Sequence, residues 1–461
     1  MLTPVSDNPR PSASLTWTGA VGEPAADPAA ANLLVHSRAQ DALAPLATAG
    51  LLGAGPRLVY LDPPYRTGRQ FGAYDDRAGA DEWLAMMREV LIGVHEVLRA
   101  DGSVWVQVDD REAHRARSLL DEVFGAGNFV ADVTWERKRK PSFLHAQVAH
   151  VTDHILVAAK DRSRLDRFTT GEQVPVRRVP LHHPGNGGST LTFPAAAVEL
   201  PGPDRTIPAG DMSTPSVSTR LLQDVRVVGG RNVDPLVMEG AWRWTQDRLD
   251  AELAAGVQVR APRLPLRPQA ITGSGSRTWT SLFTRATGMA TNEDAAEHAR
   301  ALFGSAPFDT PKPEELLERI VSTASAPGDL VIDLFAGSGT TAAVWQKLGR
   351  RWISVEMSAD VIDRFTVPRL TAVVEGRDDG GISVRRTVSP NYPLPDGWSP
   401  RDARRTGQWI AQMADAGAFD FLTPAQRDQV VATVREASTT VSEERVWSGG
   451  GGFLVGTPFR S

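Results

Sequence analysis

The octet Leu58–Tyr65 constrains this chain more than any other stretch, because an apolar run stops there at two consecutive prolines. A short apolar run of this kind predicts a buried strand. Pro63 and Pro64 lack the N–H group that a sheet ladder needs, so the strand must end there in a stiff turn. In an open α/β sheet, ligands bind at the carboxyl ends of strands. Asp62 and Tyr65 therefore suit a flat ring that carries an amine, although a core strand that ends in a plain surface turn is the alternative.

Composition narrows the class of protein. The 461 residues are enough for roughly two to four domains, and the net charge of −5 means that any nucleic-acid binding depends on local basic patches. The chain has no cysteine, which excludes disulfides and thiolate zinc sites, and we expect no metal. It has no apolar run long enough to span a bilayer and no recognisable signal peptide. We therefore expect no membrane segment and a cytoplasmic location.

Two parts of the chain alternate strands with helices. Apolar runs typical of strands occur at 32–36, 58–61, 103–108, 129–135, 154–159, 329–335 and 352–356. Helical spacing occurs at 40–50, 82–99, 119–124, 314–324, 342–348 and 361–370. This alternation predicts an α/β fold with a doubly wound, mostly parallel sheet.

The rhythm of strand and helix is lost from residue 161 to residue 300, where prolines and glycines are frequent and strands are short. We therefore divide the chain into an N-terminal arm (1–31), an α/β half (32–160), an irregular inserted region (161–300), a second α/β half (301–375) and a C-terminal extension (376–461). In the extension we expect helices at 404–414 and 423–436. The glycine cluster 449–452 is either a flexible terminus or part of an edge strand.

Two basic stretches are candidates for phosphate contact. Four consecutive cations follow a predicted strand, namely Arg137, Lys138, Arg139 and Lys140. Between residues 257 and 285 there is no acidic residue, and aromatic residues are interleaved with five arginines, namely Arg260, Arg263, Arg267, Arg277 and Arg285. Arginines with aromatic residues and without carboxylates suit a nucleic-acid face. The alternatives are a solvated charged face for the first stretch and an irregular loop region for the second.

A second candidate site lies at 335–340, where an apolar strand runs into a glycine turn and then a helix. Gly337 and Gly339 let the backbone approach a ligand closely, and the helix N-terminus offers free N–H groups. Glu356 ends the next strand about 20 residues later, where a nucleotide-binding fold carries its ribose-binding acid. No third glycine follows, which favours a mononucleoside ligand over a dinucleotide. A glycine turn selected for packing alone is the alternative.

Together these motifs resemble those of DNA amino-methyltransferases that use S-adenosylmethionine. The motif Asp62-Pro63-Pro64-Tyr65 matches the family's catalytic motif. Its cofactor loop is matched by Phe335, Ala336, Gly337, Ser338, Gly339 and Thr340. The order of the two motifs resembles the β class, in which the target-recognition region lies between them. Further stretches resemble the modification subunit of type III restriction-modification systems, namely 65–68, 101–110, 240–245, 302–313 and the closing glycines with Phe453.

The resemblance implies a Rossmann-like methyltransferase sheet with the target-recognition region inserted at 161–300. It also implies that the cofactor S-adenosylmethionine is held by residues 335–340, with its ribose on Glu356 and its methionine side flanked by Lys312 and Pro313. In this family an acid usually follows the Asn-Leu-Leu strand at once. Residues 36–39 contain none here, so Asp41 is the candidate substitute.

The resemblance further implies how the reaction is catalysed. The exocyclic amine of adenine is a poor nucleophile, so the site must align and polarise it. Asp62 and the carbonyl of Pro63 would accept the two amine hydrogens on a turn stiffened by Pro64. Tyr65 would stack on a base that has been flipped out of the duplex. An aspartate at the first position of the motif favours adenine N6 over cytosine N4.

The expected function is therefore site-specific methylation of adenine N6 in double-stranded DNA, within a restriction-modification or related defence system. A cytosine-N4 or RNA methyltransferase is one alternative. A non-catalytic DNA-binding or scaffold subunit with a relic cofactor pocket is another, although the intact Asp62 and glycines argue against it. Related modification subunits are dimers, which favours a homodimer, and a restriction or defence-system subunit is a candidate partner.

Overall fold

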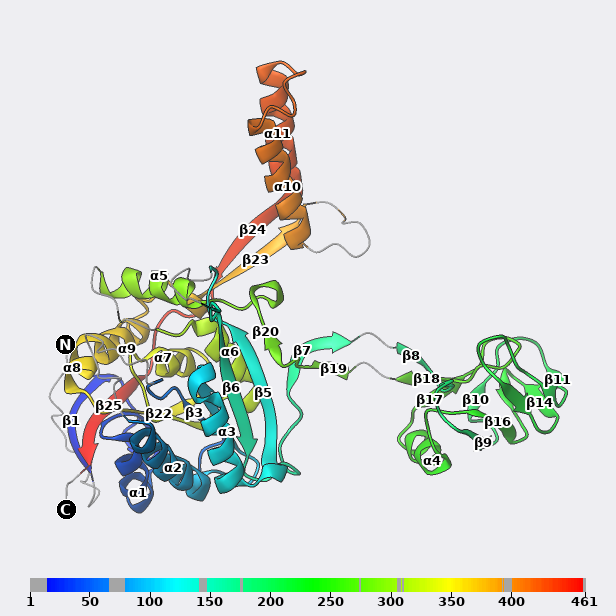
Figure 1. Ribbon diagram of the computed structural model, residues 1–461, viewed down its shortest axis with the longest axis horizontal. Coiled ribbons are helices and arrows are strands. Elements are labelled where there is room, and N and C mark those ends of the chain that lie inside the picture. The colour runs from blue at the N-terminus through cyan, green and yellow to red at the C-terminus, as the bar shows by residue number, and fades with distance from the viewer. Residues whose placement is uncertain are drawn as a thin grey trace. The chain divides into compact units, whose positions relative to one another are not determined.

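The computed structural model describes residues 15–65, 79–140, 147–174, 177–272, 275–304, 308, 311–391, 393 and 400–458. The chain forms two compact units, one of Met1–Arg167 with Thr280–Ser461 and the other of Phe168–Trp279 (Figure 1). The second unit lies within the inserted region expected at 161–300. Residues 161–167 and 280–300 of that region belong instead to the first unit. Residues 66–68, which contribute to the type III resemblance, lie outside the described residues.

The first unit is built on a ten-stranded sheet in the order β1-β25-β2-β22-β21-β3-β4-β6-β5-β20. Its strands are β1 (Leu15–Gly22), β2 (Asn32–His36), β3 (Leu58–Leu61), β4 (Ser103–Val108), β5 (Phe129–Glu136), β6 (Thr152–Ala159), β20 (Leu282–Phe283), β21 (Leu330–Asp333), β22 (Arg351–Glu356) and β25 (Gly452–Pro458). The run from β25 to β4 pairs in parallel throughout, and β6 is antiparallel to both of its neighbours. The expected doubly wound, mostly parallel sheet is therefore confirmed.

Helices cover both faces of this sheet (Figure 1). They are α1 (Ala39–Thr48), α2 (Ala80–Val97), α3 (Asp110–Phe124), α5 (Asn292–Phe303), α6 (Glu314–Ala324), α7 (Thr340–Lys347), α8 (Ala359–Val361) and α9 (Val367–Val374), with a π-helical segment at Ile362–Thr366 and short 3-10 turns at Ala126–Asn128, Arg285–Thr287 and Gly381–Ser383. One face packs on α1, α2 and α3 through alternate strand residues such as Val59, Leu61 and Val104. All four residues of β3 are buried, because neither of its faces meets solvent.

The first and last described strands of the chain pair in this sheet. Residues 15–22, which the sequence analysis placed in an N-terminal arm, form β1 and pair antiparallel with β25. The alternation of buried and exposed residues in β1 is broken by a register shift between Trp17 and Gly19, which hides the strand pattern from sequence reasoning. β25 is a strand, as one alternative held, but it lies between β1 and β2 instead of at the edge.

The second unit has a core of its own, formed by residues such as Leu191, Phe193 and Trp242. Short strands pair into a seven-stranded, a four-stranded and a two-stranded sheet. The elements are β7 (Thr169–Val174), β8 (Arg177–Pro180), β9 (Gly188–Phe193), β10 (Val198–Glu199), β11 (Arg205–Ile207), β12 (Gly210–Asp211), β13 (Thr219–Leu221), β14 (Val225–Val228), β15 (Arg231–Asn232), β16 (Leu236–Ala241), α4 (Gln246–Ala254), β17 (Gln258–Arg260), β18 (Gln269–Thr272) and β19 (Gly275–Thr278). The expected loss of α/β rhythm is confirmed.

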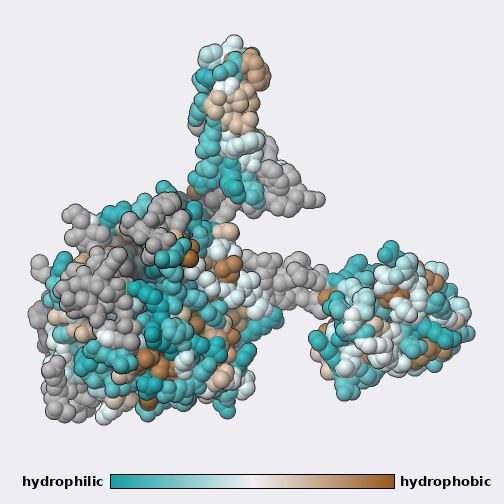
Figure 2. Space-filling view, in the orientation of Figure 1, coloured by the Kyte–Doolittle hydropathy of each residue, from teal (hydrophilic) through white to brown (hydrophobic). Residues whose placement is uncertain are grey.

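The C-terminal extension contains the two expected helices, α10 (Pro400–Asp415) and α11 (Pro424–Ser438), between the antiparallel strands β23 (Val384–Pro390) and β24 (Thr439–Arg445). A pair of helices buries little, and Phe421 and Trp409 are 81% and 60% exposed. Figure 2 shows tan and brown surface on this helical pair. Within the described part of the chain, no helix is both long enough and apolar enough to cross a membrane.

The position of β25 predicts different costs for two phenylalanine truncations. Phe453 is fully buried, and its ring centroid lies 5.6 Å from that of Trp352. Phe453→Ala should lower the free energy of unfolding by about 3–5 kcal/mol, because it leaves a cavity beside the sheet. The control Phe421→Ala should change it by less than about 0.5 kcal/mol. Denaturant unfolding followed by tryptophan fluorescence compares the two, and equal small losses would contradict the buried place of β25.

Candidate active site

The proline turn and the glycine turn leave the same edge of the sheet from neighbouring strands. β21 pairs in parallel with β3, and Asp333 lies opposite Tyr60. Each turn begins two residues later, one at Asp62 and the other at Phe335. Since parallel strands end at a common edge, the pairing brings together two motifs that are far apart in the sequence.

Asp62 is braced on both of its carboxylate oxygens. The hydroxyl of Tyr65 donates to Oδ1 at 2.6 Å, and the ammonium of Lys312 donates to Oδ2 at 2.5 Å. The same ammonium lies 5.1 Å from the centroid of the Tyr65 ring. The indole of Trp83 donates to the carbonyl of Pro64 at 2.8 Å, which pins the turn from its other side. The contact between Lys312 and Asp62 has no signal in the sequence, because the two residues share no local pattern.

A buried polar chain runs away from this turn. The hydroxyl of Tyr60 donates to Gln107 at 2.6 Å, and Gln107 donates to Asp153 at 3.3 Å. Arg137 ends the chain with an ion pair to Asp153 at 3.2 Å. Burial raises the pKa of Asp153 to about 6, although the charges of Arg137 and Lys312 oppose the rise. Arg137 therefore neutralises a buried carboxylate, which the sequence analysis did not foresee.

The glycine turn is built for close approach. Gly337 and Gly339 have φ angles of +50° and +77°, a region that side-chain-bearing residues rarely adopt. A Cβ at Gly337 would lie 3.3 Å from the ring of Phe308. Glu356 accepts from the N–H groups of Gly337 and Ser358, both at 2.9 Å. Burial raises the pKa of Glu356, although these N–H groups oppose the rise. A free helix N-terminus beside a carboxylate fits a nucleoside with a ribose diol.

The remaining candidate cofactor residues fall in three places. Phe335, Ala336, Ser338 and Thr340 belong to the glycine turn, and Pro313 precedes α6 next to Lys312. Asp41 lies in the first turn of α1, where its side chain is 61% exposed and forms an ion pair with Arg38 at 3.9 Å. Its contact is with Arg38, and its role in cofactor binding stays a prediction.

The two basic stretches prove to be partly neutralised. Arg139 pairs with Asp294, and its N–H donates to Glu293 at 3.1 Å, while Lys140 is exposed. In the second unit, Arg260 pairs with Glu199 at 3.2 Å because β10 lies beside β17.

The other arginines of the second unit differ in exposure. Arg267 donates to the carbonyl of Leu266 at 2.7 Å and to the hydroxyl of Thr214 at 3.2 Å. Arg263 is exposed, and the side chain of Arg277 lies outside the described part of the chain. Although no acid lies near them in the sequence, Arg260 and Arg267 therefore have partners in the folded unit.

A doubly wound sheet with a glycine turn beside an acid-and-aromatic turn is typical of an α/β enzyme of the methyltransferase class. The chain belongs to the DNA methylase family N6_N4_Mtase, whose model matches residues 57–366. The methyl donor of that family is S-adenosylmethionine. The family resemblance read from the sequence is therefore confirmed.

The chain is similar to a type II methyltransferase and to the Mod subunit of a type III restriction-modification enzyme. The chain is 28% identical over 355 residues to the type II methyltransferase M.EcaI of Enterobacter cloacae, covering 74% of this chain and 70% of that protein. It is 25% identical over 432 residues to the StyLTI Mod subunit of a type III restriction-modification enzyme of Salmonella typhimurium, covering 80% of this chain but only 63% of that protein. The solved structure of the PvuII cytosine-N4-specific DNA methyltransferase matches with a TM-score of 0.39 at 14% identity, covering 76% of this chain and 89% of that chain.

The burial of Asp333 predicts that the stability of the folded chain depends on pH. Its carboxyl is fully buried, and burial raises its pKa to about 7, against about 3.9 in an unfolded chain. The stability that it contributes is therefore present below pH 4 and is lost as the pH rises through 7. Asp333→Asn stays neutral, so its melting temperature relative to the parent should rise between pH 5 and pH 8. A difference that does not change with pH in thermal melts would contradict this.

Proposed function

We propose that this chain transfers a methyl group from S-adenosylmethionine to the N6 amine of an adenine flipped out of double-stranded DNA. The observation that carries the proposal is the placement of Asp62 beside the glycine turn on the neighbouring strand. We propose further that the enzyme acts in the cytoplasm as a homodimer within a restriction-modification or related defence system. The relatives named above support that setting.

The residues of the glycine turn fit the cofactor. When bound, S-adenosylmethionine supplies a methyl group that its sulfonium has already activated. The N–H groups at the start of α7 and the carboxylate of Glu356 would hold the nucleoside portion, with Phe335 against its ring. Lys312 and Pro313 would flank the methionine portion.

Asp62 acts in this proposal as an acceptor that aims the amine. Each carboxylate oxygen has two lone pairs, so Asp62 can accept from the amine while Tyr65 and Lys312 still donate to it. Those two contacts hold the carboxylate in one orientation, which lowers the entropic cost of alignment. The carbonyl of Pro63 would accept the second amine hydrogen. The ring of Tyr65 would stack on the flipped base, and leaving the duplex stack costs a few kcal/mol.

Asp62→Ala should lower the rate of methyl transfer by on the order of 1000-fold, because the amine loses its aligned acceptor. Cofactor binding should stay intact, because the glycine turn is unchanged. Transfer of labelled methyl groups to unmethylated DNA gives the rate, and calorimetry gives the cofactor affinity. The control Asp161→Ala removes an exposed acid away from both turns and should change neither. Full turnover by Asp62→Ala would sink the assignment.

The same reaction products identify the base. Mass spectrometry of hydrolysed DNA should reveal N6-methyladenine, because an aspartate opens the catalytic motif. N4-methylcytosine would instead make the chain a cytosine-N4 methyltransferase, with the same site and a different target.

We expect different effects when two arginines of the second unit are replaced by alanine. Arg263 is exposed, so Arg263→Ala should weaken DNA binding and reduce the slope of log affinity against log salt by about 1. Arg267 is half-buried and bonded to Thr214, so Arg267→Ala should mainly lower the melting temperature of that unit. Fluorescence anisotropy at several salt concentrations tests the first variant. An unchanged slope for Arg263→Ala would remove this surface from the DNA interface.

A further inference from the structure

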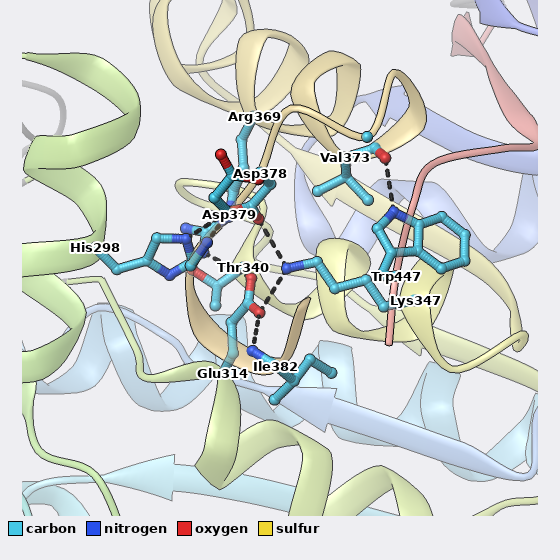
Figure 3. A network of polar contacts seen from close by, with 12 residues as sticks. His298, Glu314, Thr340, Lys347, Arg369, Val373, Asp378, Asp379, Ile382 and Trp447 are labelled. Carbon is cyan, nitrogen blue, oxygen red and sulfur yellow. Dashed lines mark hydrogen bonds and ion pairs between the residues drawn. The ribbon is translucent and has the colours of Figure 1, made fainter. Parts of the chain in front are cut away.

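Behind the glycine turn lies a network of buried charges contributed by α5, α6, α7, α9 and the segment after α9 (Figure 3). Its centre is Lys347, whose ammonium donates to Glu314 Oε2 and to Asp378 Oδ2, both at 2.7 Å. The side chains of these three residues are at most 1% exposed. His298 contacts the other oxygen of Asp378 at 2.7 Å.

Three members of this network have the composition of a metal site. The ligand atoms of His298, Glu314 and Asp378 lie within 4.8 Å of one another. The ammonium of Lys347 nevertheless donates to both carboxylates and already supplies the cation that a metal would provide. The network is therefore a set of internal ion pairs. Its role depends on the parts of the structure that it connects.

Arg369 connects the network to the candidate active site. One guanidinium nitrogen donates to Glu314 Oε1 at 3.0 Å, and the other donates to the hydroxyl of Thr340 at 2.9 Å. The side chain of Arg369 is only 2% exposed. Thr340 follows directly on Gly339 as the first residue of α7. Glu314 is the first residue of α6 and stands two positions after Lys312, which contacts Asp62.

Charge balance makes this link stiff. Burial raises the pKa of Glu314, but the charges of Lys347 and Arg369 more than offset it and hold the pKa below its usual value. Glu314 is therefore an ionised carboxylate with a cation on each of its oxygens. Breaking such a pair leaves an uncompensated buried charge, so the geometry of the pair is strongly enforced. The planar fork of arginine holds its two terminal nitrogens at a fixed spacing, one on Glu314 and the other on Thr340, which the single nitrogen of a lysine cannot reproduce.

We propose that Arg369 is a positioning residue for methyl transfer, which holds the end of the cofactor loop and the Lys312 segment in one fixed relation. This inference rests on the proposed function, because it gives Arg369 a purpose in that reaction. Through Thr340 the guanidinium fixes where α7 begins. Through Glu314 it fixes the segment from which Lys312 reaches Asp62. The donor side and the acceptor side of the site thus share one buried anchor.

The test uses two variants and their combination. Arg369→Lys keeps the charge beside Glu314 but loses the fork, and Thr340→Val removes only the hydroxyl. Each should weaken the binding of S-adenosylmethionine by roughly 10-fold, because a shift of the loop by about 1 Å is costly. The double variant should lose less affinity than the sum of the two single losses, because both changes break the bond between Arg369 and Thr340. Thr340→Val also removes the contact between the hydroxyls of Thr340 and Ser338 at 3.0 Å. If Thr340 acted on the cofactor directly, the two losses would add.

A second arginine provides a matched control. Arg350 is also buried, and it joins the far ends of α6 and α7 through the carbonyls of Ser325 and Leu348 at 2.8 and 2.7 Å. Arg350→Lys should lower the melting temperature, as Arg369→Lys also does, but it should leave cofactor affinity unchanged. If Arg369→Lys behaves in the same way, Arg369 is merely structural and the proposal is wrong.

Kinetics separate the two sides of the site. Arg369→Lys should lower kcat as well as cofactor affinity, while the affinity for DNA measured without cofactor should stay at the parent value. Should the parent chain itself fail to bind S-adenosylmethionine, the proposed function fails. A parent that binds the cofactor and an Arg369→Lys variant that binds it equally well would overturn only the role of Arg369. Thr340→Val is nearly isosteric, so if Arg369→Lys does not fold, an unchanged cofactor affinity in Thr340→Val would overturn the proposal.

Discussion

The parallel pairing of β3 with β21 is the constraint on which the rest of this structure depends. It aligns the ends of two strands whose sequences carry different halves of the chemistry, an acceptor turn and a cofactor turn. The pairing is possible because both strands are buried on both faces, so each can be a short apolar run without alternation. The inserted second unit leaves this pairing intact, since its chain enters and leaves the first unit at residues 167 and 280.

Ion pairs then determine how rigid the sheet edge that carries the two turns can be. Asp62 contacts Lys312, and two residues later Glu314 contacts Lys347 and Arg369. One short segment before and at the start of α6 therefore contacts the proline turn directly and is linked to the glycine turn through Arg369 and Thr340. Buried ion pairs add little net stability, because desolvation offsets their attraction. Their effect is geometric, since an ionised group without solvent must keep its partner.

Sequence reasoning recovered what local patterns encode. The apolar runs predicted seven of the ten strands of the sheet, and the octet at Leu58–Tyr65 and the glycine turn with Glu356 predicted both halves of the candidate site. Long-range pairing was out of reach. Nothing near Arg137 indicates Asp153, and nothing near Arg260 indicates Glu199, so both arginines were assigned to DNA although they neutralise carboxylates of the same fold.

The absence of long-range information in local sequence patterns also explains the other features that were not predicted. β1 was missed because a register shift disturbs its alternation and because its partner strand lies at the opposite end of the chain. Lys312 was selected by resemblance alone, and only the folded chain shows that it touches Asp62. Arg369 and Lys347 were not noticed at all, because a single cation on an amphipathic helix normally faces solvent.

A crystal structure with S-adenosylmethionine bound would test the central claim, that both turns form one methyl-transfer site. The decisive measurement is the distance from the nearer carboxylate oxygen of Asp62 to the transferable methyl carbon. An amine that bonds to the oxygen and attacks the methyl group must fit between them, so we predict roughly 6 Å or less. A cofactor on the glycine turn with its methyl group about 10 Å or more from Asp62, or pointing away from it, would contradict the account.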